Sequence, residues 1–232
     1  KKILYSVALA ACCMGTMTSC SDFLDASNKS NVTDKQTFAT KEGFNSLVND
    51  AYQHLQNVYA APLFTSCFSA GTDMYADARN KMNEPLNTYE TLTPENTDIK
   101  NLYTYLYAGI RAANSVSYYA QTAQVDDKTK SQLIGEARVL AAYEYYLLVN
   151  NFGGVPIMKD FLTTADTGYP KSSAADVYAY IISELEDVIS KNVLQASTAT
   201  KGGGRISQET AKAILAKTYL SAAWDLNKQE YF

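Results

Sequence analysis

Apolar residues recur at helical spacing along five segments of this 232-residue chain, and this pattern limits the fold more than any other feature. In the first segment the spacing is i, i+3, i+4, i+7, i+8 and i+11, which places the residues on one face of a helix. They are Phe44, Leu47, Val48, Ala51, Tyr52 and Leu55. Similar stripes occupy about 97–122 and 127–151, a segment after Ser173, and a segment from Ser207. No segment alternates as a half-buried strand does. The sequence therefore predicts an all-α protein.

Residues that suit helix termini stand where several of these segments begin. Thr40 is placed to cap the first helix, and the carboxylates of Asp126 and Asp127 favour the start of the third. Ser173 and Asp176, three residues apart, form the pattern of a capping box. The sequence thus predicts long antiparallel helices, stacked as pairs.

One charged residue interrupts an otherwise apolar stripe. Glu144 falls on the same face as Leu140, Leu147 and Leu148 in the helix expected over 127–151. Removing a carboxylate from water is costly unless a hydrogen bond or an opposite charge compensates it. We therefore expect Glu144 to have a polar partner or to lie at the edge of the stripe.

The segment 61–96 lacks a sustained period and is rich in proline and polar residues. An irregular stretch of this length in a compact domain usually has a functional role or is poorly ordered. Tyr75 and Tyr89 stand in it, and aromatic faces beside side chains that bind hydroxyl groups are what sugar recognition requires. The polar candidates around them are Asp73, Asp77, Arg79 and Asn80. Our hypothesis is that this segment contributes to a ligand-binding face; the alternative is that it only packs on the helices.

The N-terminus has the pattern of a secretory signal. Lys1 and Lys2 form a basic head, and an uncharged, largely apolar stretch follows that is too short to span a bilayer. The small residues Thr18 and Ser19 then precede Cys20. This arrangement resembles a bacterial lipoprotein signal, which implies lipidation of Cys20 as the first residue of the mature protein. Several acyl chains would hold the protein on a membrane surface.

Two alternatives remain for this region. Cys12 also follows small residues, but the apolar stretch 3–8 before it is shorter than a signal usually has; the whole N-terminus could instead form a buried helix. With processing at Cys20, the chain divides into a signal peptide at 1–19, a polar, flexible tether at 20–34, and a helical domain at 35–232. We expect this domain to be truncated at its C-terminus.

Charge and cysteine content exclude several classes of function. Removal of the signal leaves 18 basic and 24 acidic residues, a net charge of −6. Such a chain lacks the basic surface that nucleic acid requires, and it would not be held on anionic lipid by charge. Cys67 would be the one remaining free thiol, so no intrachain disulfide can form. We expect Cys67 to be buried and structural.

The sequence also lacks the usual means of catalysis. His54 is the single histidine and Cys67 the one free cysteine, so the common zinc sites cannot be assembled, and a Ser/His triad would have to use His54. Asp73 and Asp77 flank Tyr75 and could in principle act as the two carboxylates of a glycoside hydrolase. Because 24 acidic residues produce such pairs by chance, a solvated loop is the preferred interpretation. We expect no catalytic residue, no metal and no cofactor.

Short blocks in a fixed order along most of the chain resemble the SusD/RagB family of Bacteroidetes outer-membrane lipoproteins. The most specific block runs from Gly135–Arg138 through Tyr145–Val149 to Phe152–Pro156. The others are Cys20–Asp25, Phe38–Gly43, Ile110–Asn114, Val177–Glu186, and Gly204–Ser207 with Ala213–Leu220. Ala141 and Lys171 depart from the family, which usually carries arginine at both places, and family members are considerably longer.

The resemblance implies a tetratricopeptide-like scaffold of helical pairs with long irregular insertions. It implies a non-catalytic lipoprotein on the outer membrane, facing the exterior, that passes oligosaccharides to a SusC-like TonB-dependent transporter. Peptide binding, as in some members of the family, is one alternative. A scaffold that caps the transporter without a ligand of its own is another, and a hydrolase is a third.

Overall fold

The computed structural model describes residues 34–60, 63–75, 84–164, 168–197 and 204–228. The regular secondary structure of these residues is helical. They contain no strand, and an isolated antiparallel β-bridge pairs Thr72 with Tyr75. The helices are α3 (Asp34–Ala39), α4 (Lys41–Tyr59), α5 (Leu63–Phe68), α6 (Glu84–Thr88), α7 (Thr97–Tyr119), α8 (Asp127–Phe152), α9 (Ala174–Lys191) and α10 (Gln208–Asp225). The all-α prediction is confirmed.

Cys12 and Cys20 lie outside the described residues, as does the predicted signal peptide. The predicted tether does too, except for Asp34, with which α3 begins. Lipidation and processing therefore remain predictions.

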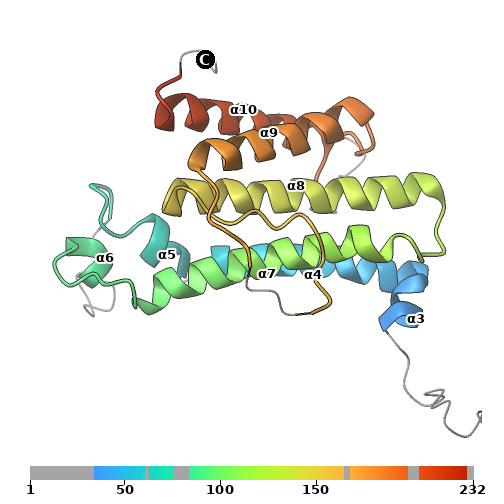
Figure 1. The fold of residues 1–232 in the computed structure, drawn as a ribbon, viewed down its shortest axis with the longest axis horizontal. Coiled ribbons are helices and arrows are strands. Elements are labelled where there is room, and N and C mark those ends of the chain that lie inside the picture. Colours follow the sequence, from blue (N-terminus) through green and yellow to red (C-terminus); the bar gives the residue numbers. More distant parts are fainter. Residues whose placement is uncertain (1–33, 61–62, 76–83, 165–167, 198–203, 229–232) are drawn as a thin grey trace, which may run out of the picture. The chain divides into compact units, whose positions relative to one another are not determined.

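The five long helices stack in the order of the chain. Figure 1 shows α7, α8, α9 and α10 side by side, and each long helix packs on the next long helix: α4 on α7, α7 on α8, α8 on α9, and α9 on α10. The helices α4 and α10 also contact α8. Hydroxyl contacts from Tyr52 to Glu136 and from Tyr59 to Tyr143 lie seven residues apart on both helices, so α4 runs parallel to α8. Helices that follow one another therefore alternate in direction, as the predicted arrangement of antiparallel helical pairs requires.

Side-chain caps fix where these helices begin. Thr40 accepts a hydrogen bond from the amide of Gly43 at the start of α4, and Asp126 caps α8 in the same way. Ser173 and Asp176 form a complete capping box on α9. The cap at Thr40 and the capping box were predicted, whereas Asp126 was expected to act only through its charge. Each cap satisfies an amide that a helix leaves without a partner.

The helix α8 is the centre of the core. It contacts α4, α7, α9 and α10, so it has buried residues on nearly every side instead of along one stripe. Its buried apolar residues are Leu133, Ala137, Val139, Leu140, Ala141, Ala142, Tyr145, Tyr146, Leu147, Leu148 and Val149. A helix that is surrounded by others needs no polar face.

Glu144 contradicts the sequence-based expectation. It lies in the middle of α8 with no exposed surface, and neither carboxyl oxygen has a hydrogen-bond partner. A Cβ on Gly109 of α7 would lie 1.7 Å from Glu144 Oε1, so the carboxyl occupies the space of the side chain that glycine lacks. Burial raises the pKa of Glu144 well above its ordinary value. The close approach of α7 at Gly109 therefore encloses a carboxyl group that has no compensating contact.

The segment 61–96 is more ordered than its sequence indicates. It contains the short helices α5 and α6, and Leu63 and Leu86 are buried. The helix α5 packs on α4 and α7, while Asn96 caps the start of α7. The described part of this segment thus covers one end of the helix stack instead of forming a continuous loop.

Candidate functional site

A turn after α5 brings two of the predicted ligand-binding residues to one place. The hydroxyl of Tyr89, just beyond α6, donates a hydrogen bond to the carbonyl of Gly71 at 3.3 Å. The amide of Gly71 donates to Asn87 Oδ1 at 3.4 Å. Tyr75 closes the same turn through its bridge with Thr72. The two tyrosines are therefore tied to a single turn, although they stand 14 residues apart in the sequence.

Glycine is required at position 71 of this turn. Gly71 has φ +75°, and a Cβ there would lie 2.2 Å from the Tyr89 hydroxyl. Tyr89 itself has φ +62°, a left-handed conformation that is uncommon for a non-glycine residue. Tyr89 thus has an unusual backbone conformation just beyond α6, and the bond from its hydroxyl to Gly71 is one of the contacts that can support it.

Both tyrosines present aromatic surface to the outside. Tyr75 is 39% exposed and Tyr89 is 59% exposed, and Asp73, two residues before Tyr75 in the turn, is exposed as well. Asp77, Arg79 and Asn80 lie outside the described residues. The described part of this segment therefore offers two rings and one carboxylate to a ligand.

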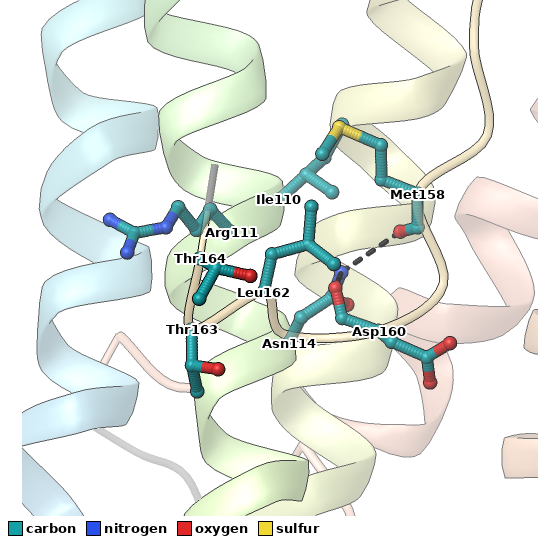
Figure 2. A pocket seen from close by; sticks show the side chains of 8 residues that line it. All are labelled: Ile110, Arg111, Asn114, Met158, Asp160, Leu162, Thr163 and Thr164. Carbon is teal, nitrogen blue, oxygen red and sulfur yellow. Dashed lines mark hydrogen bonds between the residues drawn. The ribbon is translucent and has the colours of Figure 1, made fainter. Parts of the chain in front are cut away.

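A second concave feature lies on α7, and sequence reasoning missed it. It is a pocket of about 370 Å³ between α7 and the segment that follows α8 (Figure 2). Its lining residues are Ile110, Arg111, Asn114, Met158, Asp160, Leu162, Thr163 and Thr164. The block Ile110–Asn114 is one of those that resemble the SusD/RagB family. Nothing in the sequence, however, indicates that residues 158–164 return across it.

Hydrogen bonds hold this returning segment against the helices. Asn114 Nδ2 donates to the carbonyl of Met158 at 2.9 Å and to that of Asp160 at 3.4 Å. The Tyr107 hydroxyl donates to the carbonyl of Pro156 at 2.7 Å, and the amide of Met158 donates to the Tyr145 hydroxyl at 2.7 Å. The wall of the pocket is therefore fixed from both α7 and α8.

A buried ion pair connects three distant parts of the chain. Arg205 Nε lies 2.7 Å from Glu136 Oε2, and the Glu136 side chain is fully buried. Tyr52 of α4 donates to the same carboxylate at 3.0 Å and accepts from the amide of Ile206 at 2.8 Å. Desolvation by burial raises the pKa of Tyr52 well above its ordinary value. This network joins α4, α8 and the segment 204–207 before α10, which we call the strap. Its role is therefore structural.

The other potentially reactive groups of the described residues are dispersed over the helices. Among the described residues, no three His, Cys, Asp or Glu side chains stand close enough to hold a metal ion. His54 lies 3.9 Å from Asp50 on the same helix. Burial, with a smaller effect from Asp98, raises the pKa of the Cys67 thiol to about 11, so this cysteine is a poor nucleophile. None of the described helices could cross a bilayer.

Comparison of the chain with known proteins identifies its family. Residues 22–220 match the model of a SusD-like family described as starch-binding and associating with the outer membrane. The chain belongs to the SusD-like family. It is 26% identical over 212 residues to a SusD-like protein of Bacteroides ovatus, and 28% identical over 190 residues to one of Formosa agariphila. It covers 37% and 36% of those two proteins, while 89% and 80% of its own length is matched.

Solved SusD-like structures share the fold. The surface glycan-binding protein A of Bacteroides uniformis superposes with a TM-score of 0.67 at 25% identity, over 81% of this chain and 43% of that protein. A laminarin-binding SusD-like protein superposes with a TM-score of 0.68 at 21% identity, over 83% of this chain and 42% of that one. The family predicted from the sequence blocks is therefore confirmed, and so is its helical scaffold.

Proposed function

We propose that this SusD-like protein is a non-catalytic outer-membrane lipoprotein that binds glycans at the cell surface and passes them to a SusC-like TonB-dependent transporter. The observation that carries the proposal is the family match over residues 22–220, whose description joins starch binding to the outer membrane. Relatives named for binding glycan or laminarin support a carbohydrate ligand. The absence of charge-based attraction to lipid fits a covalent anchor, for which Cys20 is the candidate.

The turn that carries Tyr75 and Tyr89 is our candidate for the ligand face. Both rings are partly exposed, and Asp73 beside them can accept hydrogen bonds from sugar hydroxyls. The C–H face of a sugar ring packs well on an aromatic ring, since both surfaces are flat and apolar. Asp77, Arg79 and Asn80 belong to the same segment and complete the proposed set.

Replacing Tyr75 or Tyr89 with alanine is expected to weaken glycan binding about tenfold in each case. Covering an aromatic ring contributes about 1.5 kcal/mol or more, and about 1.4 kcal/mol corresponds to a factor of ten in Kd. The measurement is retardation in native gels that contain soluble starch or laminarin, preceded by an array of oligosaccharides and peptides to find the ligand of the unmodified protein. Tyr105→Ala, at an exposed tyrosine of α7, is the matched control.

Unchanged retention of both variants would remove the turn from the ligand face. Binding of peptides but of no oligosaccharide by the unmodified protein would instead move it to the peptide-binding alternative. Co-purification with a β-barrel transporter but no ligand on the array would support the capping scaffold.

Substituting Cys20 with alanine is expected to abolish the incorporation of radiolabelled palmitate and to release the protein from envelope fractions. Each buried methylene contributes about 0.8 kcal/mol, so the loss of several acyl chains removes the membrane affinity almost completely. Cys12→Ala is the matched control, and it should leave both labelling and fractionation unchanged. The reverse result would assign processing to Cys12, and unchanged labelling in both variants would exclude an anchor at either cysteine.

A further inference from the structure

We propose that the pocket between α7 and residues 158–164 binds one neutral sugar ring, as a second glycan contact apart from the Tyr75/Tyr89 turn. This inference rests on the proposed function, because it names a further site for the same class of ligand. Ile110 is the first residue of α7 that lines the pocket. It lies 13 residues beyond Thr97, where α7 begins after the segment that contains Tyr75 and Tyr89, and this is about 20 Å along the helix axis.

The floor of the pocket is apolar. Ile110 is only 1% exposed, and Met158 and Leu162 are partly buried around it. The volume of about 370 Å³ lies in the range of small-ligand sites. An apolar floor of aliphatic and thioether groups suits the C–H face of a sugar ring, which needs no hydrogen bonds from that side.

The rim supplies unused hydrogen-bonding groups. Arg111, Asp160, Thr163 and Thr164 are exposed, and their side chains form no hydrogen bond or ion pair with another described residue. The Arg111 guanidinium lies over the ring of Phe161, 5.1 Å from the centroid of that ring. A guanidinium donates, a carboxylate accepts, and a hydroxyl does both. Vicinal hydroxyls of a sugar can use all three kinds of group.

The charges on the rim favour a neutral ligand. Arg111 and Asp160 carry opposite charges and extend to opposite sides of the pocket (Figure 2). A phosphate or uronate would gain at the guanidinium but be repelled by the carboxylate, and a cation would meet the reverse situation. A neutral polyol can hydrogen bond to both groups without either penalty, so it is the ligand class that this rim fits.

The pocket is also fixed before any ligand arrives. Asn114 holds the carbonyls of Met158 and Asp160, and the Tyr145 hydroxyl holds the amide of Met158. A site with a rigid wall loses little conformational entropy on binding. The amide nitrogen of Asn114 is already hydrogen-bonded to this wall, so we assign Asn114 a positioning role. We assign ligand contact to the four rim residues.

Backbone amide NMR of the 232-residue chain tests the proposal, with D-glucose, D-galactose and D-mannose as neutral probes and D-glucuronate as the charged one. We expect at least one neutral sugar to shift the amide signals of 110–114 and 158–164, and glucuronate to bind more weakly. Thr164→Val and Arg111→Leu should each weaken this binding about fivefold to tenfold, which corresponds to one hydrogen bond. The matched control is Thr104→Val, since the Thr104 hydroxyl bonds to its own helix at the carbonyl of Lys100.

The proposal is overturned if no neutral sugar shifts these signals, if both rim variants bind as the unmodified protein does, or if glucuronate binds as well as the neutral sugars. Its failure is distinguishable from failure of the proposed function. Retention on polysaccharide gels without shifts at the pocket would remove only this second contact. Absence of any glycan binding, on gels and in the titration, would remove both.

Discussion

Arg205→Ala is expected to lower the free energy of unfolding by about 3 kcal/mol. The substitution leaves the fully buried Glu136 carboxylate without its counter-charge, and breaking a buried pair from one side costs about 3–5 kcal/mol. Tyr52 and Gln132 still donate to Glu136, at 3.0 Å each, which places the expected loss at the lower end of that range. Urea unfolding followed by far-UV circular dichroism measures the change.

Two further variants separate the charge from the packing of Arg205. In the Arg205→Ala background, Glu136→Gln should recover part of the loss because the buried group is then neutral. Arg111→Ala is the matched control, because Arg111 lies over an aromatic ring as Arg205 does but forms no ion pair with a described residue; it should change the free energy of unfolding by less than about 1 kcal/mol. A loss below that limit for Arg205→Ala would show that the network of α4, α8 and the strap is not held by the ion pair.

Glu144→Leu is expected to raise the free energy of unfolding by about 1–3 kcal/mol at neutral pH. A buried polar group without a partner carries its full desolvation cost, and an apolar side chain of comparable size avoids that cost. Most core substitutions destabilise a protein, so a gain here would be diagnostic. The readout is the same urea titration, repeated across a range of pH.

The pH dependence gives this prediction a second test. The pKa of Glu144 in the folded protein is raised well above its ordinary value by burial, while in the unfolded chain it returns to about 4.3. Below pH 4 both states hold the proton. As the pH rises, the unfolded chain releases the proton and the folded protein keeps it, so stability falls by about 1.4 kcal/mol per pH unit until the raised pKa is reached. The advantage of Glu144→Leu should therefore be smallest near pH 4 and grow toward neutral pH.

Gly109 provides the matched companion variant. Gly109→Ala should destabilise the protein, since its Cβ would lie 1.7 Å from Glu144 Oε1 in a space without room for displacement. Glu144→Ala should rescue that variant by vacating the space. A stable Gly109→Ala protein, or an advantage of Glu144→Leu that does not change with pH, would contradict the enclosed, protonated carboxyl.

The helices of this protein were predictable because their determinants are local. The stripe from Phe44 to Leu55 and the caps at Thr40, Asp126 and Ser173 act within a few residues of one another, so they could be identified directly in the sequence. The family could also be identified, because its sequence blocks keep their order. The long helices α7 and α8 begin at the predicted residues, Thr97 and Asp127, for the same reason.

The candidate sites depended on contacts between distant segments. Gly71 accepts the hydrogen bond from Tyr89 only once α5 and α6 are folded. The pocket exists only because residues 158–164 return across α7. No local pattern specifies which helix faces Glu144, and for that reason the expectation that it had a polar partner or lay at the edge of the stripe was wrong.

The sequence by itself thus determined the helices, their order and the family. The tertiary structure decided which side chains share a pocket, an ion pair or an enclosed space. The physical reason is that helix formation depends on neighbours three and four residues away, whereas burial and site geometry depend on the packing of helices that are remote in the chain.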